Sequence, residues 1–285
     1  MTVAGKARGF NSVSPTEKVI RYVLLALVLV ITIGPFLWQL STSLKSVTED
    51  VFTRTPSFVP QDPTLANYAE VTETIPVIGY AANSLFVAVL VVAGNTIGAT
   101  LAGFALAKLE FRGSKLVLGL LLATLVLPGE VTLISQYVIV RGLGFADSLV
   151  GVALPGAIQM LNVLLMRTAF QSIPKEIDSA AIIDGATAWQ RLIHIGLPNV
   201  RGMLSVIVIF SFIYAWDDFL WPLLVLTDPD KYTLTVGLQY LSGTFSNNPR
   251  LIAAGTMLAF LPIVAMFAFF QRFFFRGVEA GAIKG

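Results

Sequence analysis

Long apolar runs separated by short polar stretches dominate this chain. A helix that crosses the hydrocarbon core of a bilayer needs roughly 20 predominantly apolar residues. Six stretches reach that length, and they predict membrane-spanning helices at residues 19–40, 82–107, 116–138, 149–170, 203–226 and 251–275. Pro128-Gly129-Glu130 interrupts the third stretch and Pro155-Gly156 interrupts the fourth, so we expect irregular helices there. The pattern predicts an all-α membrane protein with six transmembrane helices.

The composition agrees with a chain that lies mostly in lipid. Of the 285 residues, 55% are hydrophobic and 13% are charged, whereas a soluble domain carries about 25% charged residues. The chain has no cysteine and one histidine, His194, which excludes disulfides, thiolate metal sites and sites built from two imidazoles. Residues 1–18 are polar for too long, and the following apolar run is too long, for a cleaved signal peptide. We therefore expect a retained first helix.

The basic residues predict the orientation of the chain. With the amino terminus in the cytoplasm, fourteen of the 19 lysines and arginines fall inside and five fall outside, as the positive-inside rule requires. The predicted domains are then a cytoplasmic segment at 1–18, a transmembrane domain at 19–275 and a cytoplasmic tail at 276–285. The outer face carries eleven acids against five bases. Because a nucleic-acid partner needs a basic surface, this balance argues against one.

Two connections between the predicted spans are long. Residues 41–81 lie outside and contain prolines at positions 56, 60, 63 and 76, which predicts a partly irregular extracellular segment. Residues 172–202 lie inside and read SIPKEIDSAAIIDGATAWQRLIHIGLPNVRG. This inner segment has the pattern of two short helices joined by a turn, lying on the membrane surface.

Local signals mark the ends of both helices in residues 172–202. Pro174 suits the first turn of a helix, and the acids at 176 and 178 favour its positive amino-terminal end. Gly185 can adopt the left-handed conformation that ends this helix. Thr187 can cap the second helix, and Pro198 is expected to stop it. Small alanines on the first helix would let another protein's backbone come close, so we expect this hairpin to dock a partner.

The same hairpin carries a family resemblance. Ala180-Ala181, Asp184-Gly185 and, after nine intervening residues, Ile195-x-Leu197-Pro198 resemble the cytoplasmic EAA loop of binding-protein-dependent ABC importer permeases. Four stretches resemble the maltose-type carbohydrate permeases, specifically the shorter, six-helix member of the permease pair. They are AKLEFRG at 107–113, SIPKEI at 172–177, AWDDFLWP at 215–222 and GVEAGAIKG at 277–285.

The resemblance implies the architecture of a type I ABC importer permease, in which residues 172–202 form a coupling-helix hairpin that inserts into a groove of an ATP-binding subunit. Ser179 stands where the family usually has a glutamate that helps contact the ATPase, and the acids at 176 and 178 are close enough to substitute for it. Asp217 stands where asparagine is common. The positions that would couple to the ATPase are Asp178, Ser179, Ala180, Ala181, Asp184, Gly185, Ile195, Leu197 and Pro198.

The resemblance also implies partners for this chain. A second permease subunit would complete a heterodimer in the lipid bilayer, an ABC ATPase dimer would dock on the cytoplasmic face, and an extracytoplasmic solute-binding protein would deliver a sugar or oligosaccharide. No GxxxxGK[ST] phosphate-binding sequence is present. We therefore expect ATP and Mg²⁺ on the partner ATPase, and no cofactor, metal or catalytic residue on this chain. Its location would be the cytoplasmic (inner) membrane of a prokaryote, with both termini cytoplasmic.

Polar side chains within the predicted spans are candidates for a translocation path. Such groups cost several kcal/mol when they are left unpaired in a membrane, so their presence is informative. Sugars are bound through hydrogen bonds to their hydroxyls and by stacking on aromatic rings, which requires amides, carboxylates and tryptophans. The candidates are Asn83, Asn95, Glu130, Gln159, Asn162, Trp216, Asp217 and Asp218.

Each candidate also has a structural interpretation. Glu130 would equally suit the outer membrane surface, and the tryptophans beside Asp217 and Asp218 fit an interfacial aromatic belt. The amides are as typical of hydrogen bonds between helices as of ligand contacts. The glycines at 94, 98 and 103 favour close helix packing, and His194 near a helix end favours a structural role.

Two other classes of function fit part of the pattern. An ion-gradient-driven secondary transporter would use Glu130 or Asp217 as its ion site, but the resemblance of residues 172–202 to a coupling loop speaks against it. An intramembrane enzyme would need a nucleophile, a base and a metal in one constellation, and the sequence offers no convincing set.

Overall fold

The computed structural model describes residues 15–53, 57–242 and 248–282. Residues 1–14 of the predicted amino-terminal segment and the last three residues of the predicted tail lie outside this range. Within it the chain consists of helices, turns and loops, with one isolated bridge between Lys45 and Pro63. The predicted all-α class is confirmed for the described residues.

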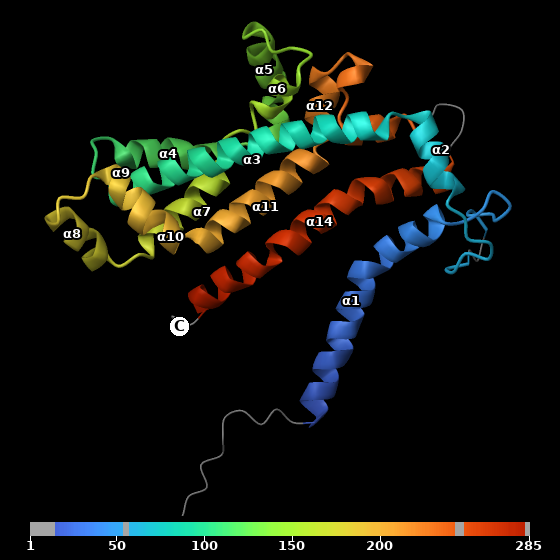
Figure 1. Cartoon of the computed structure of the whole chain (residues 1–285), viewed down its shortest axis with the longest axis horizontal. Helices are drawn as coiled ribbons and strands as arrows, with labels where there is room; N and C mark the ends of the chain where they lie inside the picture. Colours follow the sequence, from blue (N-terminus) through green and yellow to red (C-terminus); the bar gives the residue numbers. More distant parts are fainter. Residues whose placement is uncertain (1–14, 54–56, 243–247, 283–285) are drawn as a thin grey trace, which may run out of the picture.

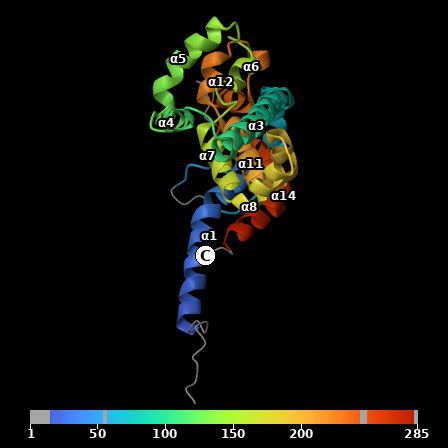
Figure 2. The ribbon, with the colours of Figure 1, turned by 90° about the vertical axis from the view of Figure 1, so that its left-hand side faces the viewer.

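Three long helices form the frame of the molecule. They are α1 (Pro15–Ser43), α3 (Val77–Lys108) and α14 (Pro249–Ala282), and each is long and apolar enough to cross a bilayer. α11 (Arg201–Asp217) packs against both α3 and α14, and α7 (Met160–Gln171) packs against α3 (Figure 1). α1 stacks Phe36 on Phe260 of α14, and its amino-terminal half diverges from the other helices (Figure 2).

The remaining predicted spans are broken. α4 (Ser114–Thr124) and α5 (Gly129–Gly142) meet at 106°, since Pro128 adopts an extended ψ of 134° and its ring cannot continue a helix. Pro155-Gly156 separates α6 (Leu149–Ala153) from α7. The described residues therefore contain three continuous helices of spanning length, or up to five spans if each of two bent pairs counts as one, where the sequence predicts six.

The fifth predicted span is also interrupted. α11 ends at Asp217, Asp218 takes an extended ψ of 127°, and α12 (Leu220–Val225) follows in a new direction. Figure 1 shows α5, α6 and α12 grouped together on one side of α3, away from α14. These short elements replace the outer parts of three predicted spans, and they enclose the cavity described below.

The two ends of the long axis carry different structures (Figure 1). At one end lie α8 (Lys175–Ile183), α9 (Ala188–Gln190), the π-helix η1 (Arg191–Gly196) and α10 (Leu197–Asn199). At the other end lie α2 (Ala66–Thr74) and the connection between α1 and α2. The sequence does not predict the helix α2. The 3₁₀ helix η2 (Pro229–Lys231) and α13 (Leu234–Gln239) pack against α3.

Close packing of α3 holds the core together. A Cβ added at Gly94 would lie 2.5 Å from the Ala157 carbonyl oxygen, and one added at Gly103 would lie 2.8 Å from Cβ of Met166. The absence of these side chains lets α3 approach α7 and the segment before it, which confirms the packing role expected for the glycines. An inner apolar cluster forms there around Phe104, Met166, Phe170, Leu192 and Ile207.

Candidate functional site

The predicted hairpin at residues 172–202 forms, and its local signals act as expected. Pro174 precedes α8, and Glu176 and Asp178 lie in the first turn of that helix. Gly185 has a φ of +82° and ends the helix with a left-handed residue. Thr187 makes a capping box with Gln190, in which the Gln190 backbone N–H donates to the threonine hydroxyl and the Gln190 side chain accepts from the Thr187 N–H.

The second arm ends close to the stop expected at Pro198. It runs through the π-helix η1 and α10 and ends at Asn199, one residue after this proline. A proline lacks the backbone N–H that a continuing helix would need, which agrees with an end at this place. The bend of 80° into α11 comes two residues later, at Val200.

An ion pair joins the two arms of the hairpin. Arg191 of the second arm donates from Nη1 to Oδ2 of Asp178 on the first arm, at 3.0 Å. The two side chains are 10% and 17% exposed, so they lie between the arms. Asp178 is therefore engaged within the hairpin, whereas Glu176 on the same helix is exposed.

The hairpin is anchored to the helices behind it. Leu192 is buried in the inner apolar cluster, and Gly196 lies so close to Phe170 that an added Cβ would be 2.9 Å from its ring. Lys108, at the end of α3, donates from Nζ to the Ile173 carbonyl at 3.0 Å. Ile195 and Leu197 also pack against this cluster. The second arm is thus a rigid extension of the membrane helices.

The opposite face of the hairpin has no protein contact in the described structure. Ile182, Ile183 and Trp189 are 55%, 86% and 61% exposed. Between the arms lies a hollow whose walls include Asp184, Gly185 and His194. Ser179, Ala180 and Pro198 are also exposed, and Ala181 is half-buried. An apolar surface of this kind on a rigid support is typical of a protein docking site.

A cavity of about 260 Å³ lies among α3, α5, α6, α11 and α12. Two of the predicted path residues, Glu130 and Asp218, line it together with Gln136, Tyr214 and Trp221. Trp221 is held in place because its indole N–H donates to the carbonyls of Gly151 and Val152 in α6. The cavity therefore combines carboxylates, an amide, a phenol and an indole, which are the groups that bind sugars.

The sequence does not single out Gln136 or Tyr214, and Trp221 enters it only as part of an aromatic belt. Tyr214 lies four residues before Asp218, and this spacing places two residues on one helix face. This spacing is the sequence signal from which Tyr214 could have been predicted to lie beside Asp218. Gln136 has no comparable signal, since its role depends on the bend at Pro128 that brings α5 beside α12.

Asn95, Gln159 and Asn162 form a buried network that reaches the cavity wall at Gly156. The Asn95 side-chain oxygen accepts from the Gln159 backbone N–H at 2.8 Å and from the Asn162 amide at 2.9 Å, and Asn162 also donates to Ser211 at 3.1 Å. Asn95 donates to the carbonyl of Gly156 at 2.7 Å. This network joins α3, α7 and α11, as the structural interpretation of the amides expects.

The other predicted path residues have separate positions. Trp216 is buried, and its indole N–H donates to the Ala259 carbonyl of α14 at 3.0 Å. Asp217 is exposed and does not line the cavity. Asn83 donates to the carbonyls of Asp230 and Tyr232 at 2.9 and 3.0 Å, so it holds the loop that contains η2.

A carboxylate fastens that same loop to the end of α5. Asp147 accepts from the backbone N–H groups of Thr227 and Asp228, and Lys231 donates to it at 2.8 Å. Lys231 is also 3.1 Å from Asp228. The hydrogen bond from Lys231, with help from the two backbone donors, holds the pKa of Asp147 well below its usual range. These groups form an outer latch, defined here as Asp147, Asp228 and Lys231.

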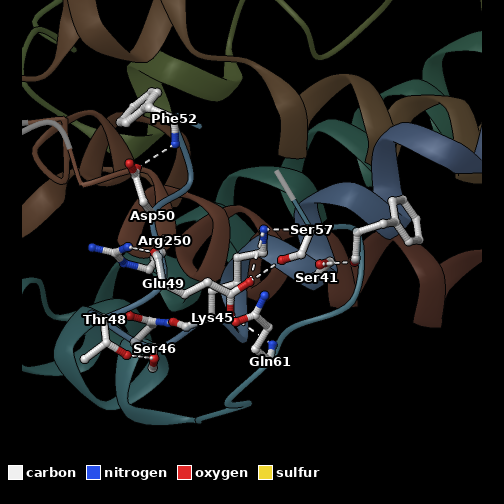
Figure 3. Close-up of polar contacts among 12 residues, drawn as sticks. Ser41, Lys45, Ser46, Thr48, Glu49, Asp50, Phe52, Ser57, Gln61 and Arg250 are labelled. Atoms are coloured by element: carbon white, nitrogen blue, oxygen red, sulfur yellow. Dashed lines mark hydrogen bonds and ion pairs between the residues drawn. The ribbon is translucent and has the colours of Figure 1, made fainter. Parts of the chain in front are cut away.

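A second polar cluster orders the connection after α1 (Figure 3). Lys45 is fully buried, lies 4.9 Å from the Trp38 ring centroid and donates to the Ser57 carbonyl at 2.7 Å. Glu49 lies 3.6 Å from Lys45 and accepts from the Ser57 hydroxyl, which lowers the pKa of Glu49. Arg250, at the start of α14, donates to the Glu49 carbonyl at 2.7 Å. The end of α1 at Ser43 and the start of α14 at Pro249 are therefore tied together.

Comparison with known proteins identifies the family. Residues 94–280 match the family described as "Binding-protein-dependent transport system inner membrane component". The chain is 31% identical to the arabinooligosaccharides transport system permease protein of Halalkalibacterium halodurans, with 80% of this chain and 82% of that protein covered. It is 32% identical to the sulfoquinovosyl glycerol transport system permease protein of Agrobacterium fabrum, with 94% of each covered.

A third relative and a solved structure agree with this assignment. The maltodextrin transport system permease protein of Bacillus subtilis is 31% identical, with 94% of this chain and 97% of that protein covered. A chain from the crystal structure of a bacterial ABC transporter for import of the acidic polysaccharide alginate superposes with a TM-score of 0.80 at 23% identity, covering 92% of this chain and 99% of that one. The last match shows a shared fold.

The comparisons and the described site agree on what kind of component this is. Permease subunits of this family do not hydrolyse ATP and bind no cofactor of their own. Across the part of the chain that the structure describes, no three metal-binding side chains come together. The chain belongs to the binding-protein-dependent permeases, the multi-pass inner-membrane components of ABC importers.

Proposed function

We propose that this chain is one of two permease subunits of an ABC importer for oligosaccharides. It would cross the membrane six times, with α4/α5, α6/α7 and α11/α12 each acting as one bent span, and both termini would be cytoplasmic. The amino-terminal segment would be residues 1–18, the transmembrane domain residues 19–275 and the tail residues 276–285. The names of relatives that transport arabinooligosaccharides and maltodextrin support the substrate class.

The observation that carries this proposal is the hairpin at 172–202. It has one arm fixed in the inner apolar cluster and an exposed apolar face that includes Ile183 and Trp189. A docking partner can change the state of the membrane helices only if its contacts differ between states, and a rigid second arm would transmit that difference. The proposed partner is an ABC ATPase dimer, with a solute-binding protein on the outer face.

The turn at Gly185 provides a test. A Cβ added there meets no atom within 4 Å, so a substitution strains only the backbone at φ +82°. Gly185→Val should distort the turn, because β-branched residues strongly disfavour this conformation. Gly185→Asn is the matched control, since asparagine tolerates the left-handed region. We expect the valine variant to lose ATP-dependent uptake in proteoliposomes and to release the ATPase on purification, while the asparagine variant keeps both. Wild-type uptake with bound ATPase in Gly185→Val would refute the coupling role.

We further propose that solute passes the cavity lined by Glu130 and Asp218, whose wall at Gly156 is held by the side chain of Asn95. Glu130→Ala should lower uptake while the complex still assembles, and Asp217→Ala tests whether the neighbouring exposed carboxylate also contributes. Normal uptake in both variants would remove these residues from the path.

A secondary transporter remains the competing function, and one assay separates the two. Uptake that survives a protonophore and a sodium ionophore but stops when ATP is withheld supports the importer. The opposite pattern would make the carboxylates ion sites and would contradict the proposed docking of an ATPase.

A further inference from the structure

The charges that face the cavity all have one sign. Glu130 enters from the first turn of α5, and Asp218 enters from the break between α11 and α12. Among the described residues that line the cavity there is no lysine, arginine or histidine. The other polar groups in its walls, the Gln136 amide and the Tyr214 phenol, are neutral. From this chain a solute inside therefore meets two carboxylates and no compensating cation.

Bases near the cavity-lining elements do not reach the cavity wall. Lys231 contacts both Asp147 and Asp228, at 2.8 and 3.1 Å, so two acids surround one base in the outer latch. Arg250 donates to a backbone carbonyl. Arg141 lies in the last turn of α5, and neither it nor Lys231 nor Arg250 lines the cavity.

The shape of the cavity restricts what can lie there. Pockets for drug-sized ligands measure roughly 300–1,000 Å³, so a volume of about 260 Å³ suits about one sugar ring. The fixed indole of Trp221 offers a flat apolar wall beside hydrogen-bond acceptors. Carboxylates accept strong hydrogen bonds from sugar hydroxyls or from an ammonium group, but they repel a carboxylate or sulfonate held at the same distance.

We infer that this cavity selects solutes by charge: it admits neutral or amine-bearing sugar units and rejects units that carry a carboxylate or a sulfonate. This inference rests on the proposed role of the cavity in the solute path and adds a substrate class to it. Selection of this kind would act inside the membrane, independently of the choice made by a solute-binding protein.

The absence of native cysteines makes the charge of the cavity directly measurable. Gln136→Cys places a single thiol in the cavity wall of the full chain, expressed in membranes with its partner subunits made cysteine-free. The probes are two thiol reagents of similar size, 2-aminoethyl methanethiosulfonate, which is cationic, and 2-sulfonatoethyl methanethiosulfonate, which is anionic. The readout is the ratio of their reaction rates, divided by the same ratio for a free thiol in solution.

We expect this normalised ratio to exceed one by on the order of tenfold in favour of the cationic reagent. Glu130→Gln combined with Asp218→Asn should bring it close to one, and Asn can still accept the Trp221 backbone N–H that Asp218 accepts. Glu73→Gln removes the same charge from exposed α2, away from the cavity, and should leave the ratio unchanged. Co-purification of the partner subunits checks that each variant assembles.

Three results would overturn the inference. The first is a ratio near one at Gln136→Cys, and the second is a ratio that survives removal of both carboxylates. The third is no reaction with either reagent at Gln136→Cys and at a second reporter, Leu133→Cys, which would show that solutes do not reach the cavity. Labelling does not require transport, so the two proposals can fail separately. If Gly185→Val keeps wild-type uptake and bound ATPase while the labelling ratio is tenfold, the coupling role is refuted and the charge selection stands.

Discussion

The ion pair between Asp178 and Arg191 should determine how rigid the hairpin at residues 172–202 is. Asp178→Asn keeps the size of the side chain but removes its charge, and it leaves the guanidinium of Arg191 between the two arms without a counter-ion. Arg191→Met removes the cation and keeps an apolar chain of similar length. The double variant removes both charges, so the three variants form a thermodynamic cycle that isolates the pairwise free energy.

The expected magnitude follows from the geometry. Exposed ion pairs contribute about 0–1 kcal/mol, and breaking a fully buried pair costs about 3–5 kcal/mol. The pair here is 3.0 Å long, and its side chains are 10% and 17% exposed, so an intermediate coupling of about 1–2 kcal/mol is expected. Nε of Arg191 is already buried without a hydrogen-bond partner, which makes Asp178→Asn the more harmful single change. A coupling of this size shifts an opening equilibrium by about 5- to 30-fold.

Hydrogen exchange of the hairpin amides, measured in the assembled complex, is the assay. Exchange in residues 175–199 should accelerate by roughly tenfold in Asp178→Asn, and the double variant should recover part of the protection. Glu176→Gln, an exposed acid in the same helical turn, is the matched control and should accelerate exchange less than Asp178→Asn does, because it loses only its interaction with the helix end. The reasoning is refuted if the cycle gives a coupling free energy of zero within error, or if the control accelerates exchange as much as Asp178→Asn does.

Three further variants, one of them with a matched control, test the packing and the latch. Gly103→Ala should lower the free energy of unfolding of the purified chain by about 1–3 kcal/mol, because its Cβ would collide with α7. Gly119→Ala in α4 is the control: its Cβ meets no atom within 4 Å, so the free energy of unfolding should be equal or higher. Asn162→Leu should cost about 1–3 kcal/mol, since its buried partners lose their bonds, and unchanged melting in detergent would contradict this. Because the pKa of Asp147 is lowered in the folded chain, the latch keeps its stabilisation above the ordinary carboxyl pKa of 3.8 and loses it as the pH falls further. The amides of residues 226–233 should therefore be equally protected from exchange at pH 5 and at pH 8, after correction for intrinsic rates. Asp147→Asn should remove that protection at both pH values.

Local chemistry made the coupling hairpin readable from the sequence. Gly185 and Thr187 act within one or two turns of the chain, through a left-handed residue and a capping box. Such signals depend on neighbours in the sequence, so a single sequence reveals them. The pairing of Asp178 with Arg191 depends instead on how the two arms fold against each other, so the sequence alone does not predict it.

The cavity was harder to predict for a related reason. Hydropathy counts apolar residues along a run, and it does not say where a helix breaks or which way the next element turns. Pro128, directly before α5, and Asp218, directly after α11, mark breaks inside runs that hydropathy counts as single spans. The resulting bends bring Gln136 and Trp221 to the same cavity. Only one of these four residues, Asp218, was selected as a path residue from polarity within a span.

The amide network links these two sites mechanically. Asn162 lies in α7, eight residues before Phe170, which contacts the second arm of the hairpin at Gly196. The same network fixes, through Asn95, the carbonyl of Gly156 in the cavity wall. Because buried amides with satisfied hydrogen bonds resist small displacements, α3, α7 and α11 should move as one unit when the hairpin is displaced. A motion imposed at Trp189 would then reach the cavity as a change in the position of its α11 wall relative to α5, which joins α4 through the bend at Pro128.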